Sequence, residues 1–578
     1  MRWRLRETSP ELVDLLTREA GISPVVAQLL AARGVASPED ARKFLSPSLS
    51  DLHSPYLMAG LCPALERLRA AIDRNEPILI YGDYDVDGTT AIVILKTALE
   101  LCGGKVDFYV PHRIREGYGM RDEVIEAAAS QGVRLIISVD TGIRAFAAAE
   151  AAARCGVDLI VTDHHLPQSE GIPKALAVVN PNQPGCQYPC KSLCGAGVAF
   201  KISQALLEVT GRDRLLPSFL KIVAIATIAD SVPLVGENRV FAKLGLDGLQ
   251  KPRNPGLRAL LTACQLDGSR PISAGDIGFR LAPRLNAAGR MDIAKRVIDL
   301  FTEKDEVRAA EMAMQLTELN GDRQSEERRI LQEICEQIDS TPEWKDAYAL
   351  VVGGEGWHRG VIGICATRVV ERYHRPALVF SCENDEAHGS GRSIEAFHML
   401  EALESCADMF TRFGGHAHAV GCALPTERLP QLRSHLEAYA RNKLTAEDLL
   451  PVLDCDSEIG LTDINHKLWE SLAKLEPFGV GNPRPTFVAR GVKLVQPPRI
   501  LKETHLKLRV MQGNRGEQRA HDVLAWRMAQ RSIEDTLVLG DILDLAFYLD
   551  YSAHPDFGGI QLTLLDFAKG GVERSITS

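Results

Sequence analysis

Long apolar segments are missing from this 578-residue sequence. The first residues, MRWRLRETSPELVDLL, contain arginines but are not followed by an apolar stretch of secretory length, and the apolar run AIVIL after Thr90 ends at Lys96. A membrane-spanning helix needs about 20 apolar residues, and a signal peptide needs an apolar core of about 7 to 15. We therefore expect a cytoplasmic protein that does not enter a membrane.

Cysteine is scarce as well. The 13 cysteines are scattered along the chain, which argues against a disulfide framework. Cys186, Cys190 and Cys194 form one cluster, CQYPCKSLC. A structural zinc site pairs cysteines two to four residues apart with a second pair elsewhere, and the sequence has no obvious second pair. We favour small apolar packing residues over metal ligands here.

A positive net charge is also absent, because the formal charge at pH 7 is -10. This value argues against a protein that coats nucleic acid non-specifically, although a local basic groove remains compatible with it. With 45% apolar and 25% charged residues, the composition is that of a globular protein. At roughly 100 to 200 residues per domain, the length predicts three to five domains.

Between about residues 60 and 230, short apolar runs alternate with alanine-rich segments of helical periodicity. The apolar runs are PILIYGD, KVDFYVP, RLIISVD, DLIVTDHH and LAVVNPN. Such alternation is typical of a largely parallel sheet with helices on both faces. We predict an α/β domain over residues 60–301.

Polar side chains follow four of these predicted strands: Asp83 to Asp87 in YGDYDVDGTT, Asp140, the triplet Asp163-His164-His165, and Asn180 to Asn182. In open α/β sheets, ligands bind outside the carboxyl ends of the strands. Any one of these residues is explained by a turn or a helix cap, but the whole set is not. We expect the chemistry to gather at this edge of the sheet.

The crowding of Asp83, Asp85 and Asp87 predicts bound cations. Carboxylates this close destabilise one another unless cations neutralise them. Aspartate oxygens suit Mg²⁺, and an added imidazole shifts the preference towards Mn²⁺. Two such metals about 3.5 to 4 Å apart activate water for attack on phosphorus, with one carboxylate as a bridge. Asp140 is our candidate for that bridge.

The rest of the chain divides into three further segments. Residues 302–340 are rich in Glu, Arg, Gln and Leu, with a helical period interrupted mainly by Gly321, and predict a long connecting helix. Residues 341–445 read as a second α/β unit. Residues 446–578 contain short alternating runs such as LKLRVM and GIQLTLLDF, which favour a small β-barrel. Residues 1–59 remain an N-terminal segment.

Ten motifs, in order, resemble the DHH phosphoesterase superfamily and, within it, the bacterial RecJ single-strand exonucleases. They are GDYDVDG, SVDTGI, VTDHHLP, VVNPN, GAGVAFK, IATIADSVPL, FRLAPRLNAAGRM, WHRGVIGI, GSGRS and FGGHAHAVG, and the resemblance extends over most of residues 60–425. The resemblance implies a parallel-sheet DHH domain, a long helix, an α/β DHHA1 domain and a C-terminal OB-like barrel.

The resemblance also implies a site for two Mn²⁺ or Mg²⁺ ions. Its expected ligands are Asp83, Asp85, Asp87, Asp140, His164 and Asp230. His165 would contact the scissile phosphate, and Asp163 would orient the histidines. Taken alone, Asp230 after LKIVAIATIA favours a capping role, and His165 is compatible with a structural histidine.

A nuclease that starts at a 5′ end needs a pocket for the terminal phosphate, and arginine forks and backbone amides are suitable donors. The resemblance indicates Arg113, Arg290, Ser390 and Arg392, with His416 nearby in the second lobe. Each could instead be a surface charge or a helix cap. The glycines of GSGRS would let the backbone approach a phosphate, although such loops are common.

The predicted barrel would track single strands by basic and aromatic contacts. The segment LEPFGVGNPRPTF is similar to the start of that domain in the family, and Lys502, His505, Lys507 and Trp526 are candidate contacts. For Trp526 we favour a place in the barrel core.

Together these resemblances imply a metal-dependent exonuclease that degrades single-stranded DNA 5′ to 3′ to 5′-mononucleotides, in recombination and repair. They imply a single-strand binding protein and a RecQ-type helicase as partners, and we expect a monomer. One alternative is a phosphodiesterase for short RNA oligonucleotides or dinucleotides, and another is a catalytically inactive single-strand-binding replication factor. An inorganic pyrophosphatase is disfavoured, because that branch has a histidine at the position of Tyr81.

Overall fold

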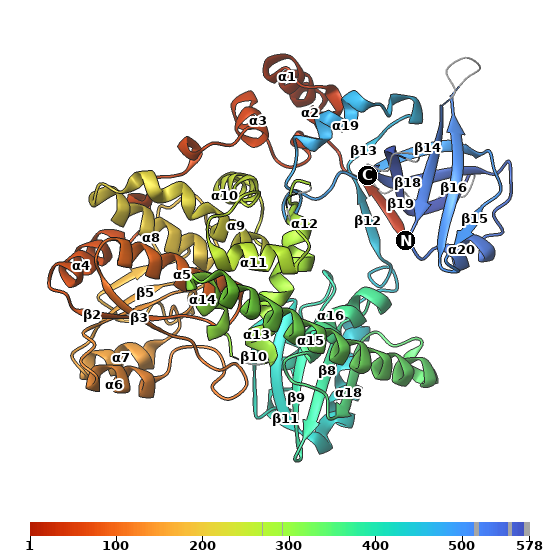
Figure 1. Ribbon diagram of the computed structural model, residues 1–578. Helices are drawn as coiled ribbons and strands as arrows, with labels where there is room; N and C mark the ends of the chain where they lie inside the picture. Colours follow the sequence, from red (N-terminus) through yellow and green to blue (C-terminus); the bar gives the residue numbers. More distant parts are fainter. Residues whose placement is uncertain (267, 269, 292, 514–518, 553–557, 571–578) are drawn as a thin grey trace. The chain divides into compact units, whose positions relative to one another are not determined.

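The computed structural model describes residues 1–266, 268, 270–291, 293–513, 519–552 and 558–570 (Figure 1). The chain divides into two compact units, and each is described by itself. The larger unit contains residues 53–232 and 244–450, and the smaller unit contains residues 1–52, 233–243 and 451–578.

A sheet of five parallel strands forms the first domain of the larger unit, in the order β3-β2-β4-β5-β6. The strands are β2 (Pro77–Tyr81), β3 (Lys105–Tyr109), β4 (Leu135–Ser138), β5 (Asp158–Thr162) and β6 (Ala177–Val179). Leu79 and Tyr81 of β2 face one side, where they share a hydrophobic core with Ile125 and Ala148. The buried strands read as continuous apolar runs because both faces of the sheet are covered.

The helices of this domain cover the sheet from two sides (Figure 1). Helices α6 (Asp122–Ser130) and α7 (Phe146–Arg154) pack together on one side. On the other side α5 (Val86–Leu101) packs against α8 (Gly195–Val209) and α9 (Leu220–Ala229), and α4 (Leu61–Asp73) contacts α8. The alternation of strands and helices confirms the predicted parallel α/β architecture.

A helical segment leads from this domain to the second one. It contains α11 (Pro255–Ala263), α12 (Ala274–Asp276), the π-helical turn η4 (Ile277–Leu281), α13 (Ala282–Met291), α14 (Lys295–Thr302) and α15 (Glu306–Ser340). Helix α15 runs through Gly321 without a break, over 35 residues.

A mixed five-stranded sheet, ordered β10-β11-β9-β8-β7, forms the second domain. Strands β7 (Leu350–Glu355) and β8 (Ala377–Glu383) are parallel, and β9 (Glu386–Arg392), β11 (Ala419–Pro425) and β10 (Arg412–His416) continue the sheet antiparallel. The accompanying helices are α16 (Ile362–Tyr373), α17 (Met399–Glu404) and α18 (Leu429–Lys443). This sheet places the GSGRS segment on β9 and the FGGHAHAVG segment on the β10-β11 hairpin.

The smaller unit contains a closed barrel. Its strands are β14 (Phe487–Leu494), β16 (His505–Gln512), β17 (Arg519–Ala525), β18 (Ile542–Ser552) and β19 (Gly559–Lys569). Strand β14 pairs with both β16 and β18, and β17 pairs in parallel with β19, so the ring of hydrogen bonds closes. The predicted OB-like barrel is confirmed. The short elements β13 (Ser457–Glu458), β15 (Arg499–Leu501), α19 (His466–Ala473) and α20 (Ala529–Glu534) accompany it.

The N-terminal residues fold with this barrel. Strand β1 (Arg2–Leu5) pairs in parallel with β12 (Val452–Cys455). Helices α1 (Pro10–Ala20), α2 (Pro24–Ala31) and α3 (Pro38–Leu45) add Leu16, Leu30 and Phe44 to a core that also contains Leu508 and Phe547 of the barrel. Most of α10 (Gly236–Gly248) also belongs to this unit. The domain boundaries drawn from the sequence remain predictions.

Among the helices in the described part of the chain, none combines the length and the apolar character needed to span a bilayer.

Candidate metal and phosphate site

The loop that follows β2 carries the first carboxylates of the site. Asp85 is the N-cap of α5, and its Oδ1 accepts a hydrogen bond from the Gly88 amide at 3.0 Å. Asp83 and Asp87 are almost fully buried. Gly88 is required by packing, because a Cβ at this position would lie 2.6 Å from the carbonyl oxygen of Asp83.

Asp87 is held by the N-terminus of a second helix. Its two carboxylate oxygens accept hydrogen bonds from the amides of Gly195 and Ala196, at 2.5 and 2.8 Å, in the first turn of α8. Free N–H groups and the helix dipole stabilise negative charge at such a position. The GAGVAFK segment therefore has a local role beside the carboxylates.

Asp140 follows β4 and adopts a left-handed backbone conformation with a φ of 59°. It is 2% exposed. A Cβ on Gly195 would lie 2.5 Å from the Asp140 side chain. The glycine thus lets the start of α8 approach both Asp87 and Asp140.

His164, after β5, brings the carboxylates of different elements together. Its Nε2 lies 3.2 Å from Asp140 Oδ1, 3.8 Å from Asp87 Oδ2 and 4.0 Å from Oδ2 of Asp230. Asp230 is the C-cap of α9. Asp230 therefore caps α9 and also belongs to the acidic cluster.

The predicted ligands, together with His165, form three overlapping groups, and within each group the ligand atoms lie within 4.8 Å of one another: Asp83 with Asp85 and Asp140, Asp87 with His164 and Asp230, and Asp140 with His164 and His165. Asp140 belongs to two of the groups. The structure thus brings all six predicted metal ligands to one place. Their roles as ligands remain a proposal.

The cluster fits divalent cations. Burial, together with the neighbouring carboxylates, raises the pKa of Asp83, Asp85 and Asp140 above the ordinary aspartate value, and raises that of Asp230 to about 9. Asp83 Oδ1 and Asp140 Oδ1 are buried and accept no hydrogen bond from the described residues. Burial lowers the pKa of His164 below 6.5, which favours the neutral imidazole that binds metals. The buried carboxylates therefore need positive charge to neutralise them, and divalent cations would supply it.

Asp163 organises the two histidines. It is fully buried, and its Oδ1 accepts hydrogen bonds from the His164 amide at 2.7 Å and from the His165 amide at 3.1 Å. The same oxygen lies 2.7 Å from His165 Nδ1, and Oδ2 accepts from the Ile143 amide. Burial opposes the protonated form of His165, but the hydrogen bond and charge of Asp163 outweigh it and raise the pKa of His165 above 6.5.

A basic cleft of about 760 Å³ lies between the two domains of the larger unit. Four of the five predicted phosphate-binding residues border it, namely Arg113, Arg290, Ser390 and Arg392. His416, the fifth, does not border this cleft and is exposed at the end of β10. Three more arginines line the cleft: Arg359, which belongs to the motif WHRGVIGI, and Arg115 and Arg412, which lie outside the quoted motifs and carry no local sequence signal.

The protein itself holds several of these guanidinium groups in place. Arg113 lies over the Tyr84 ring at 4.8 Å, and Tyr84 stands between two of the acidic residues in the sequence. Arg290 donates to the carbonyl oxygen of Gly360, and Arg392 donates to that of Gly391. Burial and the nearby Arg113 lower the pKa of Arg290 to about 9. Anions would relieve this accumulation of positive charge.

Asn286 is a further residue that the sequence analysis did not identify. Its side-chain oxygen accepts a hydrogen bond from the Val86 amide at 3.2 Å, next to Asp85. It belongs to the motif FRLAPRLNAAGRM, which the sequence marks only as part of the family pattern, because the contact joins residues 200 positions apart.

Trp526 corrects our prediction for the barrel core. Its side chain is 56% exposed, and its ring meets that of His505 with centroids 4.9 Å apart. Trp526 directly follows β17, in which Val523 and Ala525 are buried, so the alternation along the strand places Trp526 on the outward side. Lys507, also a candidate, forms an ion pair with Asp522 at 2.9 Å, and Lys502 is exposed. Basic and aromatic side chains therefore share the outer surface of the barrel.

Comparisons with protein families match three parts of the chain. Residues 77–227 match the DHH family N-terminal domain, residues 346–442 match the DHHA1 domain, and residues 455–566 match the RecJ OB domain.

Similar curated proteins are named single-stranded-DNA-specific exonuclease RecJ. The protein of Bacillus subtilis strain 168 is 40% identical, over 88% of this chain and 64% of its own length. That of Dickeya dadantii is 37% identical, over 84% and 86%, and that of Escherichia coli K12 is 33% identical, over 88% and 90%. The chain thus spans less than two thirds of the Bacillus protein and most of the other two.

Solved structures are similar as well. RecJ from Thermus thermophilus in complex with Mn²⁺ matches with a TM-score of 0.84 and 30% identity, over 98% of this chain and 79% of that one. A structure of the same protein in complex with Mg²⁺ matches with a TM-score of 0.77 and 28% identity, over 98% and 78%.

Proposed function

Because this chain belongs to the RecJ family of single-stranded-DNA-specific exonucleases, we propose that it hydrolyses single-stranded DNA from the 5′ end and releases 5′-mononucleotides. The observation that carries this proposal is the pairing of two features in one unit. A buried cluster of aspartates and His164 lies at the sheet edge, and a cleft bordered by arginines lies between the domains. Such a pair suits a substrate with two phosphates, one to be cut and one to be held.

The cofactors of the proposal are two Mn²⁺ or Mg²⁺ ions, held by Asp83, Asp85, Asp87, Asp140, His164 and Asp230. The buried Asp83 and Asp140 oxygens without hydrogen bonds support this assignment, as do the RecJ structures in complex with Mn²⁺ and Mg²⁺. When bound, such ions act as Lewis acids that lower the pKa of water and polarise the phosphate.

His165 is the proposed proton carrier at the scissile phosphate. With Nδ1 engaged by Asp163, Nε2 is the ring nitrogen that would meet the substrate. Water adds to phosphorus, and the bond from phosphorus to the 3′-oxygen of the terminal nucleotide breaks. That oxygen takes the proton held on Nε2, and the proton lost by water passes to solvent. The raised pKa of His165 supports this role, because it favours the protonated imidazole.

The 5′ polarity follows from the arginine cleft in this proposal. Arg113, Arg290, Ser390 and Arg392 would hold the terminal 5′-phosphate, with Arg115, Arg359 and Arg412 adding positive charge. Arginine suits this task because its planar fork matches two phosphate oxygens at once. The terminal 5′-phosphate would occupy this cleft while the next phosphate reaches the acidic cluster.

A nuclease assay tests both parts of the proposal. Single strands labelled at the 5′ or the 3′ end are incubated with the wild type, with Asp140→Ala and with Asp73→Ala, which changes an exposed aspartate at the end of α4. We expect the wild type and Asp73→Ala to release labelled mononucleotide from the 5′ end, and Asp140→Ala to lose about 1000-fold or more in rate, as two-metal chemistry requires. Equal activity of Asp140→Ala would refute the metal assignment, and release from the 3′ end would refute the polarity. A preference for strands of two to five ribonucleotides would favour the alternative phosphodiesterase.

Metal binding can be measured without activity. Mn²⁺ that binds only the folded cluster raises the unfolding temperature by mass action. We expect a rise for the wild type and for Asp73→Ala, and none for Asp140→Ala. A rise of equal size in all three proteins would contradict the assigned ligands.

The proposal extends to the role of the protein in the cell. We propose a cytoplasmic monomer that acts in DNA recombination and repair beside a single-strand binding protein and a RecQ-type helicase. The barrel, with Lys502, His505, Lys507 and Trp526, would contact the single strand. Sedimentation of the full chain tests the monomer, and co-sedimentation with each purified partner tests the associations.

A further inference from the structure

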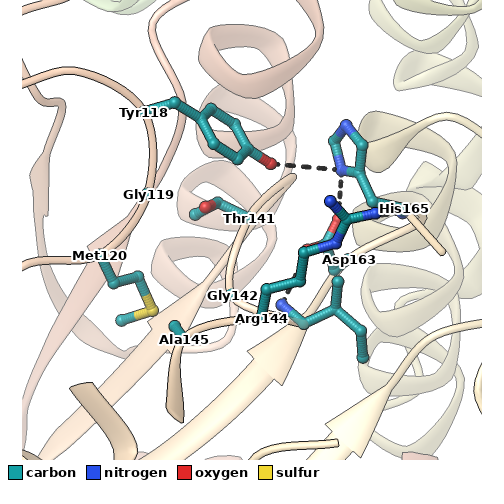
Figure 2. Close-up of a pocket in the computed structure, with 10 residues that line it drawn as sticks. Tyr118, Gly119, Met120, Thr141, Gly142, Arg144, Ala145, Asp163 and His165 are labelled. Atoms are coloured by element: carbon teal, nitrogen blue, oxygen red, sulfur yellow. Dashed lines mark hydrogen bonds and ion pairs between the residues drawn. The ribbon is translucent and has the colours of Figure 1, made fainter. Parts of the chain in front are cut away.

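A second cavity, of about 310 Å³, opens beside His165 in the larger unit. Figure 2 shows Tyr118 and Met120 facing His165 and Arg144 across it, with Thr141 between them and Ala145 at the lower end. Its volume lies at the lower end of the range for sites that bind small organic molecules. None of the six proposed metal ligands lines this cavity.

Tyr118 borders both this cavity and the arginine cleft. Its side chain is 54% exposed, and its hydroxyl lies 3.4 Å from His165 Nδ1. One side chain therefore separates the place proposed for the 5′-phosphate from the space beside the catalytic histidine. Because the two spaces share Tyr118, a nucleotide with its 5′-phosphate in the cleft and its 3′-phosphodiester at His165 would carry its base beside this cavity.

We propose that the cavity binds the base of the 5′-terminal nucleotide, an inference that rests on the proposed nuclease function. The Tyr118 ring offers an aromatic face, and its exposure leaves that face accessible to a base. Base–aromatic stacking contributes about 1–3 kcal/mol per base and does not depend on base identity. The cavity thus adds binding energy for the nucleotide that is about to be released.

The other walls suit a base of any sequence. Met120 is flexible and polarisable, so that it adapts to purines and pyrimidines. Gly142 has a φ of 113°, and a Cβ there would lie 2.6 Å from Ser138 Oγ and 3.3 Å from the sulfur of Met120. This wall is therefore bare backbone. The thioether has no hydrogen-bond donor with which to read the pattern of groups on a base edge.

Arg144 closes the side nearest to the chemistry. Its guanidinium donates two hydrogen bonds to the carbonyl oxygen of Leu166, at 3.1 and 3.0 Å, and the residue is otherwise exposed. In this proposal its positive charge would face the sugar-phosphate chain of the same nucleotide. The base thus meets the apolar part of the cavity, and the phosphate meets the charged part.

The experiment uses single strands with a 5′-phosphate and one abasic residue at position 1, 2 or 3. We expect the wild-type kcat/KM for release of the first nucleotide to fall about 10-fold when position 1 is abasic, within the range of stacking energies. Abasic residues at positions 2 and 3 should have effects of less than about 2-fold. An equal rate with an abasic position 1, or a loss that follows position 2, would overturn the proposal.

Variants of the protein provide the second arm. Ala145→Leu places a larger side chain in the wall of the cavity, and Ala147→Leu makes the same change at an exposed position of α7. We expect Ala145→Leu to slow the intact strand about 10-fold and to leave the rate on the position-1 abasic strand unchanged, whereas Ala147→Leu should behave as the wild type. Equal losses of Ala145→Leu on both strands would overturn the proposal.

Met120→Ala covers the case in which Ala145→Leu does not fold. It should reduce the wild-type preference for the intact strand over the abasic strand, and an unchanged preference would count against the cavity. Failure of the nuclease function itself has a different signature, because the wild type would then release no nucleotide from any intact strand.

Discussion

Both carboxylate oxygens of Asp87 accept hydrogen bonds from the protein itself. Two amides at the start of α8 donate to it, and Gly195 provides one of them. Asp140 approaches the same glycine so closely that no Cβ fits between them. At the scale of single residues, the acidic cluster therefore depends on the glycine at position 195 as much as on the carboxylates.

Gly195→Ala tests this dependence. The added Cβ would lie 2.5 Å from Asp140, so either the carboxylate or the start of α8 must move. We expect Mn²⁺ affinity and nuclease activity to fall about 10–100-fold, the usual effect of displacing the groups that orient metal ligands. Metal titration and the end-label assay measure both quantities.

Gly197→Ala is the matched control, two residues along the same helix. Its Cβ would meet its nearest neighbour, the Leu193 side chain, at 3.4 Å, an ordinary contact. Equal losses for the two variants would show that the helix tolerates no change at all, and the specific contact with Asp140 would then be irrelevant.

Helix α13 connects the acidic loop with the second domain, at the scale of a whole element. Asn286 accepts from the Val86 amide, Gly289 packs against the Tyr84 backbone, and Arg290 donates to Gly360. The next long helix, α15, also contains a glycine, Gly321, which is exposed and has no atom within 4 Å of the position of a Cβ. The sequence pattern does not distinguish Gly289 from Gly321, but the packing around the two glycines differs.

Substitution by alanine should therefore have opposite effects at the two glycines. We expect Gly321→Ala to stabilise the larger unit by about 0.5–1 kcal/mol, because alanine restricts the unfolded chain and favours the helix, with unchanged activity. Gly289→Ala should lower activity, because its Cβ would lie 2.3 Å from the Tyr84 carbonyl oxygen and would push α13 away from the acidic loop. Urea unfolding and the nuclease assay measure the two effects. A stabilised, fully active Gly289→Ala would contradict the role given to α13.

At the scale of the whole molecule, the two ends of the chain fold together. Arg33, from the N-terminal helices, has a fully buried side chain that donates to Asn482 and to the carbonyl oxygen of Pro483, both at 2.8 Å. It also pairs with Asp456 at 3.4 Å. One guanidinium thus joins segments that are more than 400 positions apart in the sequence.

Arg33→Met should destabilise the smaller unit by about 3–5 kcal/mol, because it leaves the buried Asp456 without its cation. Arg4→Met is the control, since Arg4 pairs with Asp454 at the surface, where side-chain exposures are 51% and 36%, and such pairs contribute about 0–1 kcal/mol. Urea unfolding, with proteolysis of the smaller unit as the readout, measures the stability of both variants. Equal effects would show that burial of the pair does not matter.

The sequence by itself determined the local features of this protein. Alternating apolar runs fix the parallel sheet, since strand and helix periods are properties of short segments, and the polar residues after each strand mark the edge where the acidic cluster forms. The tertiary structure decided what depends on distant segments: the place of α8 against Asp87 and Asp140, the arginines that meet in one cleft, the exposure of Trp526 and the union of the two chain ends. These contacts join residues that are far apart in the chain, and no local pattern encodes which distant surfaces will bury one another.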